Sequence, residues 1–309
     1  MTSPADTAMP RVGLIGLGAM GAGMAGSLRR AGYAPYVFDI RPGVAQAFAR
    51  DGGTACASVV ELAAACDVVI SVVVNAQQTE QVLFGDQTGG GDTGAAAAMK
   101  PGSVFVMCST VDPNVSIAFE HRLHSMDLLY LDAPISGGAA KAASGQMTMM
   151  TAGTPAAYAR CGGALDAMAA KVYKLGDRAG AGSKVKIINQ LLAGVHIAAA
   201  AEAMALGLRE GVDAAALYEV ITHSAGNSWM FENRMAHVLA ADYTPLSAVD
   251  IFAKDLGLVL DTARATKFPL PLASTAHQMF MQASSAGFGR EDDSAVIKIF
   301  PGIELPKGS

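Results

Sequence analysis

The chain has 309 residues, of which 51% are hydrophobic and 16% charged, and its net charge at pH 7 is −5. This composition is typical of a globular protein with a large core and excludes a disordered chain. A negative chain has no overall basic field, so we expect no nucleic-acid partner. The length predicts two domains.

The four cysteines form no CxxC pair, so we expect small buried side chains in a reducing compartment. No His and Cys spacing typical of a metal site occurs, and we expect no metal. The first ten residues, MTSPADTAMP, lack a basic segment followed by an apolar one, which argues against a secretion signal. The expected location is the cytoplasm.

A dinucleotide-binding pattern begins at residue 11. Residues 11–16 (RVGLIG) predict a buried strand, and residues 16–21 (GLGAMG) form a GxGxxG that opens a helix ending near Gly32. Residues 36–39 predict the next strand. A strand, a glycine turn, a helix and a second strand together indicate a Rossmann-like domain far more specifically than GxGxxG alone.

Each glycine of this turn has a physical task. Gly16 permits the tight turn, Gly18 lets the backbone approach a pyrophosphate, and Gly21 lets the helix pack on the strand. The N-terminus of the helix offers its N–H groups to the phosphates. The predicted pyrophosphate-binding residues are Gly16, Gly18, Ala19, Met20 and Gly21.

An acidic residue ends the second strand. Asp39 stands eighteen residues after Gly21, where a carboxylate accepts hydrogen bonds from the ribose hydroxyls and repels a ribose phosphate. This favours NAD over NADP. Arg41 opposes that preference, because an arginine at this position can hold the phosphate.

Strands and helices continue to alternate up to residue 175. The pattern predicts strands at 67–74, 103–107, 128–131, 148–152 and 172–175, and helices at 58–65, 77–84 and after Pro113. We expect residues 88–98, which are rich in glycine, to form a surface loop without chemistry.

Polar residues follow three of these strands. Asn75 lies at the carboxyl edge of the sheet, where α/β proteins bind ligands. Ser109 or Thr110 either contacts the cofactor or caps the following helix. In DAPISGG, Ser136, Gly137 and Gly138 leave a strand and expose successive N–H groups, which suits a carboxylate, although a plain turn is the alternative.

Residues 180–207 predict one long, almost wholly apolar helix. Lys186, Asn189 and Gln190 are spaced i, i+3 and i+4 and therefore share one face. We expect a helix that is apolar all round to be buried, and a buried lysine needs a partner or a role. The alternatives are a lysine that extends to water and a membrane span, but the polar residues make a span unfavourable, so we expect no membrane.

This helix divides the predicted architecture. Residues 10–179 form an NAD-binding, Rossmann-like α/β domain, and residues 180–309 comprise the interdomain helix and an all-helical domain. Helices are predicted at 213–224, 231–240, 247–266, 274–286 and 292–300, with a loop at 225–229. Lys254 and Asp255 are either a solvated surface pair or, since their stretch is mostly apolar, directed inward.

Four motifs together resemble the β-hydroxyacid dehydrogenases, the family of 3-hydroxyisobutyrate dehydrogenase and tartronate semialdehyde reductase. They are GLGAMGAGMAGSL with Asp39, DAPISGG, GAGSKVKIINQ and KDLGL, and the resemblance covers nearly the whole chain. It implies a Rossmann-like domain, a long interdomain helix, an all-helical domain and a homodimer or homotetramer. Residues 88–94 look like an insertion relative to the family.

The resemblance also implies residue roles. Lys186 matches the catalytic lysine, residues 136–138 match the substrate-carboxylate loop, and Lys254 matches the lysine that reaches the cofactor and active site. Many members have two asparagines after the lysine, whereas this chain has Asn189 and Gln190. These two amides are expected to bind the substrate, with Gln190 on a hydroxyl. Lys186 has to be neutral to accept the hydroxyl proton, and burial favours its neutral form.

Within the family, further segments resemble the members that act on L-threonate: NQLLAGVHIAAAAEAMALG, HSAGNSWMFENRM, FPLPLAS and GREDDSAVIKIF. This implies oxidation of the second-carbon hydroxyl to 2-dehydro-L-erythronate with NAD. Three alternatives are another hydroxy acid such as glycerate or 3-hydroxyisobutyrate, an imine reductase, and a non-catalytic NAD-binding module. The retained lysine and carboxylate loop argue against the last two.

Overall fold

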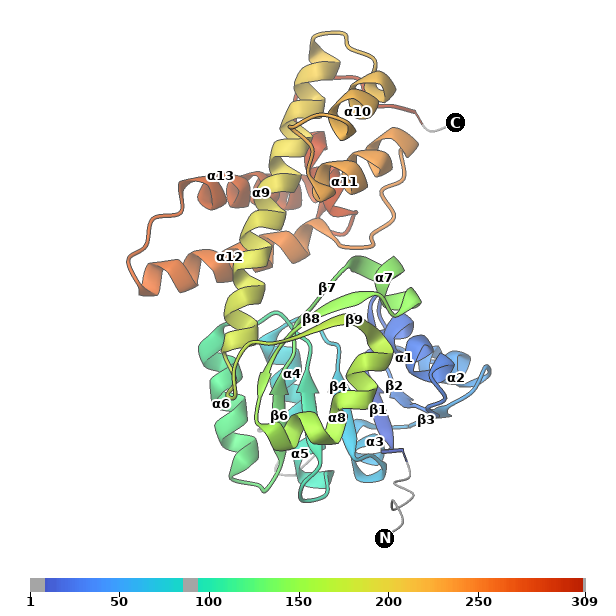
Figure 1. Cartoon of the computed structure of the whole chain (residues 1–309). Helices are drawn as coiled ribbons and strands as arrows, with labels where there is room; N and C mark the ends of the chain where they lie inside the picture. The colour runs from blue at the N-terminus through green and yellow to red at the C-terminus, as the bar shows by residue number, and fades with distance from the viewer. Residues whose placement is uncertain (1–8, 86–93, 308–309) are drawn as a thin grey trace. The chain divides into compact units, whose positions relative to one another are not determined.

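The computed structural model describes residues 9–85 and 94–307, and the chain divides into two compact units, Met1–Lys186 and Ile187–Ser309. Figure 1 shows strands with surrounding helices in the first unit and helices in the second. The predicted fold class, an α/β unit and an all-helical unit connected through one long helix, is confirmed.

A nine-stranded sheet forms the centre of the first unit. Its strands are β1 (Val12–Ile15), β2 (Tyr36–Phe38), β3 (Thr54–Ala55), β4 (Val68–Ser71), β5 (Val104–Met107), β6 (Leu129–Asp132), β7 (Ile135–Ser136), β8 (Met147–Gly153) and β9 (Ala169–Lys174). The order is β3-β2-β1-β4-β5-β6-β8-β7, with β9 paired to β8. The first six strands are parallel, and β8 runs antiparallel to β6. The strand order reverses between β1 and β4, which is where doubly wound sheets bind dinucleotides.

Helices pack on both faces of this sheet. They are α1 (Gly21–Arg30), α2 (Val44–Ala49), α3 (Val59–Ala65), α4 (Ala76–Phe84), α5 (Ala95–Ala98), α6 (Pro113–His124), α7 (Gly138–Ser144) and α8 (Pro155–Met168). Alternate residues of one strand point to opposite faces, so both faces of the parallel strands are apolar.

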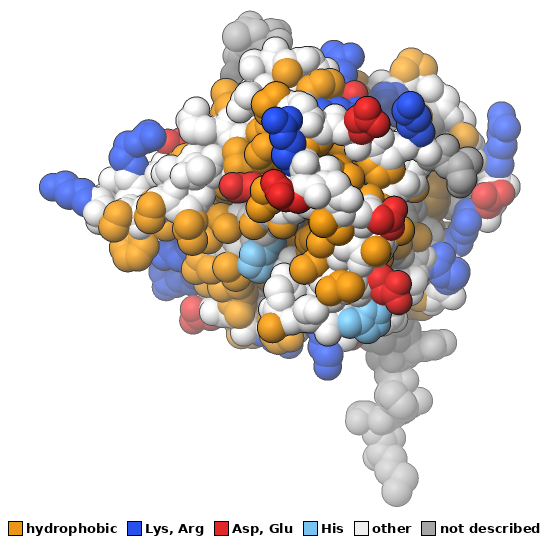
Figure 2. All heavy atoms as spheres, turned by 90° about the horizontal axis from the view of Figure 1, so that it is seen from above, with side chains coloured by type: hydrophobic (Ala, Val, Ile, Leu, Met, Phe, Trp, Pro, Cys, Tyr) orange, Lys and Arg blue, Asp and Glu red, His pale blue; other side chains and the backbone are white. Residues whose placement is uncertain are grey.

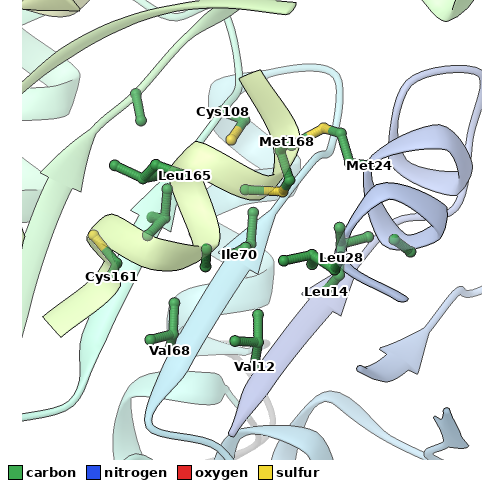
Figure 3. Packing of buried hydrophobic residues seen from close by; sticks show 14 of the residues in the cluster. Val12, Leu14, Met24, Leu28, Val68, Ile70, Cys108, Cys161, Leu165 and Met168 are labelled. Carbon is green, nitrogen blue, oxygen red and sulfur yellow. The ribbon is translucent and has the colours of Figure 1, made fainter. Parts of the chain in front are cut away.

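Two hydrophobic clusters follow from this alternation. On one face Leu14 and Ile70 pack with Leu28 of α1 and Met168 of α8, as Figure 3 shows. Strand side chains that point to the other face of the sheet, such as Phe105, belong to a second cluster that includes side chains of α3, α4 and α6. The sheet is therefore buried on both sides, which leaves the ends of its strands for polar chemistry.

The second unit is helical. Its elements are α9 (Ala181–Arg209), which begins in the first unit, α10 (Ala214–Thr222), α11 (Trp229–Ala240), α12 (Val249–Ala265), α13 (Pro271–Ala283), a π-helical turn (Ser284–Phe288) and a 3₁₀ helix (Asp293–Ile299). Its core includes Met204 of α9, Met235 of α11, Leu256 of α12 and Phe280 of α13.

A buried polar cluster links α11 to the 3₁₀ helix. Arg234 forms an ion pair with Asp293, whose side chain is fully buried, and His237 Nδ1 lies 3.1 Å from Asp292 Oδ1. The Asp292 carboxylate also caps the 3₁₀ helix by accepting from the N–H and hydroxyl of Ser294. The pairing offsets the cost of removing these charges from water.

The expectation that the long helix is buried all round is wrong. One side of α9 lies in the core of the second unit, but Ile188, Leu192 and Leu206 are 61%, 51% and 62% exposed. By length and composition α9 is the one described helix that meets the criteria for a membrane span, and 44% of its most apolar window is buried inside the protein. Core helices of folded domains meet the same criteria, as α9 does here.

Other sequence predictions need correction. The expected loop over 88–98 is partly helical, because Ala95–Ala98 form α5 and bury two alanines, whereas residues 88–93 lie outside the described part. Helix α13 begins at Pro271 rather than at 274, since proline is favourable in a first helical turn. The elements β3, β7, α2, α7 and α8 were not predicted, because they are short or lack apolar periodicity.

Candidate functional site

The glycine turn joins β1 to α1 as the GxGxxG pattern predicts. Gly16 has a φ of +93°, which favours glycine, and its N–H donates to Phe38 O at 2.9 Å. A Cβ on Gly21 would lie 1.8 Å from Gly16 O, so only glycine allows the helix to start this close to the strand.

The residues of this turn fit a pyrophosphate. A Cβ on Gly18 would meet no atom within 4 Å, so the loop backbone faces open space there. Ala19 and Met20 lead into α1, and Met20, its N-cap residue, makes no side-chain capping bond. The first turn of a helix carries N–H groups without intrahelical acceptors, which is the arrangement that binds phosphate.

Asp39 is fixed beside the turn. Its carboxylate accepts hydrogen bonds from the backbone N–H groups of Leu17 (2.7 Å) and Arg41 (2.9 Å). The Arg41 guanidinium adds two more at 2.9 Å and donates to Leu17 O at 3.1 Å. The hydrogen bond from the Arg41 side chain, with the backbone donors, lowers the pKa of Asp39 to about 2. Arg41, predicted to oppose Asp39, is therefore its direct partner.

The strand ends next to the turn carry further polar residues. Asn75 caps α4, and its side-chain oxygen accepts from Gln78 N–H at 2.8 Å. Helix α6 is capped by Asp112, so the capping alternative for Ser109 and Thr110 is wrong. Ser109 instead donates to the carbonyl of Val73 at 2.8 Å. A cofactor contact of Thr110 remains a prediction.

The Ser136–Gly138 loop joins β7, which ends at Ser136, to α7, which begins at Gly138. Ser136 pairs with Thr148 of β8, and Gly137 and Gly138 have φ values of +134° and +75°. A Cβ on Gly137 would lie 3.0 Å from atoms of the Lys141 side chain. Both positive φ values favour glycine at these positions. Binding of a carboxylate by this loop remains a prediction.

A buried carboxylate fixes the start of α9. Asp132, at the end of β6, accepts from the N–H groups of Gly180 (2.8 Å) and Ser183 (2.9 Å) and from the Ser183 hydroxyl (2.7 Å). Burial raises the pKa of Asp132. Lys186, one turn further along α9, is only 7% exposed, so the extended, solvated alternative for this lysine is wrong.

A second buried carboxylate connects three polar residues of the second unit. Asp255, 2% exposed, accepts a hydrogen bond of 2.6 Å from the Gln190 side-chain amide and lies 2.7 Å from Lys254 Nζ. The Asn189 amide donates to Gln190 at 3.0 Å. The interpretation of Lys254 and Asp255 as a solvated surface pair is therefore wrong.

The structure thus gathers the predicted residues into two sets. The first unit holds the glycine turn with Asp39, the Ser136–Gly138 loop and Lys186, and the second holds Asn189, Gln190 and Lys254. Sequence reasoning missed Asp132 and Asp255 as the residues that organise each set. The sequence did contain a cue to the importance of each: Asp132 is the first residue of DAPISGG, and Asp255 is a charged residue in an apolar stretch. Across residues 9–85 and 94–307, no three His, Cys, Asp or Glu side chains are grouped to hold a metal.

Two family models together match most of the chain. The NAD binding domain of 6-phosphogluconate dehydrogenase matches residues 11–176, and the NAD-binding domain of NADP-dependent 3-hydroxyisobutyrate dehydrogenase matches residues 180–300. An L-threonate dehydrogenase from Cupriavidus necator is 67% identical over 295 residues, with 96% of this chain and 97% of that protein covered. The chain belongs to the β-hydroxyacid dehydrogenase family. The family resemblance inferred from the motifs is confirmed.

Two other similar proteins agree with this assignment. The L-threonate dehydrogenase of Escherichia coli K12 is 52% identical, with 96% of both chains covered. The crystal structure of 3-hydroxyisobutyrate dehydrogenase from Salmonella typhimurium has a TM-score of 0.89 at 54% identity, and the match covers 94% of this chain and 99% of that one. This β-hydroxyacid dehydrogenase is an NAD-dependent oxidoreductase that acts on a CH–OH group.

Proposed function

We propose that the protein oxidises the second-carbon hydroxyl of L-threonate to 2-dehydro-L-erythronate with NAD. The observation that carries this proposal is the 67% identity, over nearly the full chain, to an L-threonate dehydrogenase. The retained lysine, carboxylate loop and amides supply the groups that oxidation of a hydroxy acid needs.

Lys186 is the proposed acid/base. When bound, NAD would supply the hydride acceptor for the carbinol carbon, and the hydroxyl proton has to leave at the same centre. The Lys186 amine, on a residue that is 7% exposed, takes this proton as a general base. Asp132 holds the first turn of α9 and thereby orients the lysine.

The remaining residues bind and orient. Ser136 and the N–H groups of Gly137 and Gly138 hold the substrate carboxylate, which orients the carbinol for transfer. Asn189 and Gln190 bind substrate hydroxyls. An amide has two donors and two acceptor lone pairs, so Gln190 keeps capacity for a hydroxyl beside its bonds to Asp255 and Asn189.

Most of the proposed cofactor contacts lie in the first unit, and Lys254 of the second unit adds one more. Gly16, Gly18, Ala19, Met20 and Gly21 bind the pyrophosphate. Asp39 binds the ribose hydroxyls with Arg41 beside it, and the other cofactor contacts are Asn75, Thr110 and Lys254. Residues 10–179 are the proposed NAD-binding domain and residues 180–309 the proposed substrate and assembly region.

We also propose a homodimer or homotetramer in the cytoplasm. The exposed apolar side chains of α9 provide a surface for a second copy, and Figure 2 shows a face on which hydrophobic side chains adjoin one another between scattered charges. All four cysteines are free and buried, which suits a reducing compartment. Light scattering of the purified protein measures the oligomeric state directly.

A substrate panel tests the proposed reaction. NADH appearance is followed with L-threonate, D-threonate, D-erythronate, D-glycerate and 3-hydroxyisobutyrate, each with NAD and with NADP. We expect the highest kcat/KM with L-threonate and NAD. The second candidate is 3-hydroxyisobutyrate, because the Salmonella typhimurium structure carries that name. Turnover chiefly with 3-hydroxyisobutyrate would reject L-threonate, and turnover of no hydroxy acid would reject the dehydrogenase role.

A further inference from the structure

Two helices of the first unit, α1 and α7, pack with their backbones in contact (Figure 1). A Cβ on Gly23 of α1 would lie 2.6 Å from Ala143 N and 2.8 Å from Ala142 C, both atoms of the α7 backbone. Real Cβ atoms do not approach backbone this closely, so any larger residue at Gly23 would displace α7. Gly23 lies outside the GxGxxG pattern, and pyrophosphate binding does not explain it.

Two side chains of α1 reinforce this contact. The hydroxyl of Ser27, which is 3% exposed, donates to Ala142 O at 3.0 Å. Arg30 donates to Ser27 Oγ at 2.7 Å and also to Ala143 O. The last carbonyls of a helix have no intrahelical donor, and Ser27 supplies one to Ala142 in a buried position, whereas the bond from Arg30 to Ala143 is exposed.

The anchored helix follows directly on the proposed carboxylate loop. Helix α7 has seven residues and therefore spans about 10 Å, and it begins at Gly138. The opposite end of the loop is held by the pairing of Ser136 with Thr148. A segment held at both ends has little freedom, so a shift of the last turn of α7 moves the loop.

We propose that Gly23, Ser27 and Arg30 are positioning residues for the Ser136–Gly138 loop, so that the helix that binds NAD also sets the affinity for the hydroxy acid. The inference rests on the proposed function of that loop. Gly23 permits the close approach of α1 to α7, and the Ser27 hydroxyl fixes how the two helices align by donating to Ala142 O. Arg30 donates both to Ser27 and to the last turn of α7.

The test separates substrate affinity from cofactor affinity. Gly23→Ala and Ser27→Ala are compared with wild type for kcat, KM of the hydroxy acid and the dissociation constant of NADH. We expect KM to rise about tenfold in both variants, because a displaced loop holds the carboxylate less well. The NADH dissociation constant stays within about twofold, since neither side chain belongs to the GxGxxG turn.

Gly26→Ala is the matched control. It makes the same substitution on the same helix, but its Cβ would meet only the end of Arg30 at 3.5 Å, an ordinary contact. We expect its KM to equal that of wild type. An unchanged KM in Ser27→Ala, or an NADH dissociation constant that rises in step with KM, would overturn the inference.

Amide hydrogen exchange distinguishes this inference from the proposed function. Residues 136–144 should exchange faster in Ser27→Ala than in wild type and Gly26→Ala, whichever hydroxy acid is turned over. Equal exchange in all three proteins contradicts the positioning role even if L-threonate is the substrate. Faster exchange in a protein that oxidises no hydroxy acid would reject the proposed function and retain the anchoring of the loop by α1.

Discussion

The side-chain amide of Gln190 on α9 donates a hydrogen bond of 2.6 Å to Asp255 on α12. The acceptor is 2% exposed and lies 2.7 Å from Lys254 Nζ through its other oxygen. One buried carboxylate therefore orients two residues with proposed roles at substrate and cofactor. A buried carboxylate without these partners would be strongly unfavourable, so the three side chains are mutually dependent.

Replacing Asp255 should impair substrate binding and stability together. In Asp255→Ala, Gln190 loses its acceptor, and we expect KM for the hydroxy acid to rise about tenfold and the free energy of unfolding to fall by about 1–3 kcal/mol. Steady-state kinetics and urea unfolding measure the two effects. Asp255→Asn retains an acceptor oxygen and should fall between Asp255→Ala and wild type. Wild-type KM in Asp255→Ala would contradict the assigned role.

Lys186→Ala should remove turnover without removing the cofactor. Loss of a general acid/base lowers kcat by about 10²–10⁴-fold, while we expect the NADH dissociation constant to change less than about twofold. Lys184→Ala is the matched control, because it removes an exposed lysine of the same helix. Residual turnover near that of wild type in Lys186→Ala would exclude the lysine as the proton acceptor.

Asp39→Ala should weaken the preference for NAD. The carboxylate, with a pKa of about 2, is charged at every working pH and would repel a ribose phosphate. We expect kcat/KM with NAD to fall about tenfold or more, while kcat/KM with NADP is unchanged or higher. Arg41→Ala leaves the two backbone donors to Asp39 in place and should keep most NAD activity. An unaltered NAD to NADP ratio in Asp39→Ala would refute this assignment.

The pair of His237 and Asp292 should make stability depend on pH. The hydrogen bond to Asp292 raises the pKa of His237, so protonation is favoured in the folded state. The contribution is then complete below about pH 6.5, the value for an unfolded histidine, and is lost as pH rises through the higher folded pKa. Burial raises the pKa of Asp293 to about 6, so its titration falls mostly below this window.

Thermal unfolding of wild type and His237→Gln between pH 6 and 9 measures this dependence. We expect the stability difference between them to shrink by about 1 kcal/mol or less as pH rises, as is usual for partly exposed ion pairs. A difference that grows with pH would show that the neutral imidazole is the stabilising form.

Local patterns correctly predicted the strand, the glycine turn and the helix at the start of the first unit. The turn from Gly16 to Gly21, and Asp39 beyond it, are close in sequence, and their geometry follows from one strand, one turn and one helix. Patterns failed where an element is short or a contact is distant. Helix α7 has no apolar periodicity that marks it, and its packing on Gly23 joins residues about 120 positions apart.

The sequence alone determined the fold class, the family and the types of residue available for chemistry, because periodicity and motif spacing are properties of neighbouring residues. Only the tertiary structure decided that Arg41 pairs with Asp39, that Asp132 accepts a hydrogen bond from the residue before α9 and that Asp255 accepts one from Gln190. The last two join residues 48 and 65 positions apart. Burial makes such partners obligatory, and burial depends on the packing of the whole chain rather than on any local pattern.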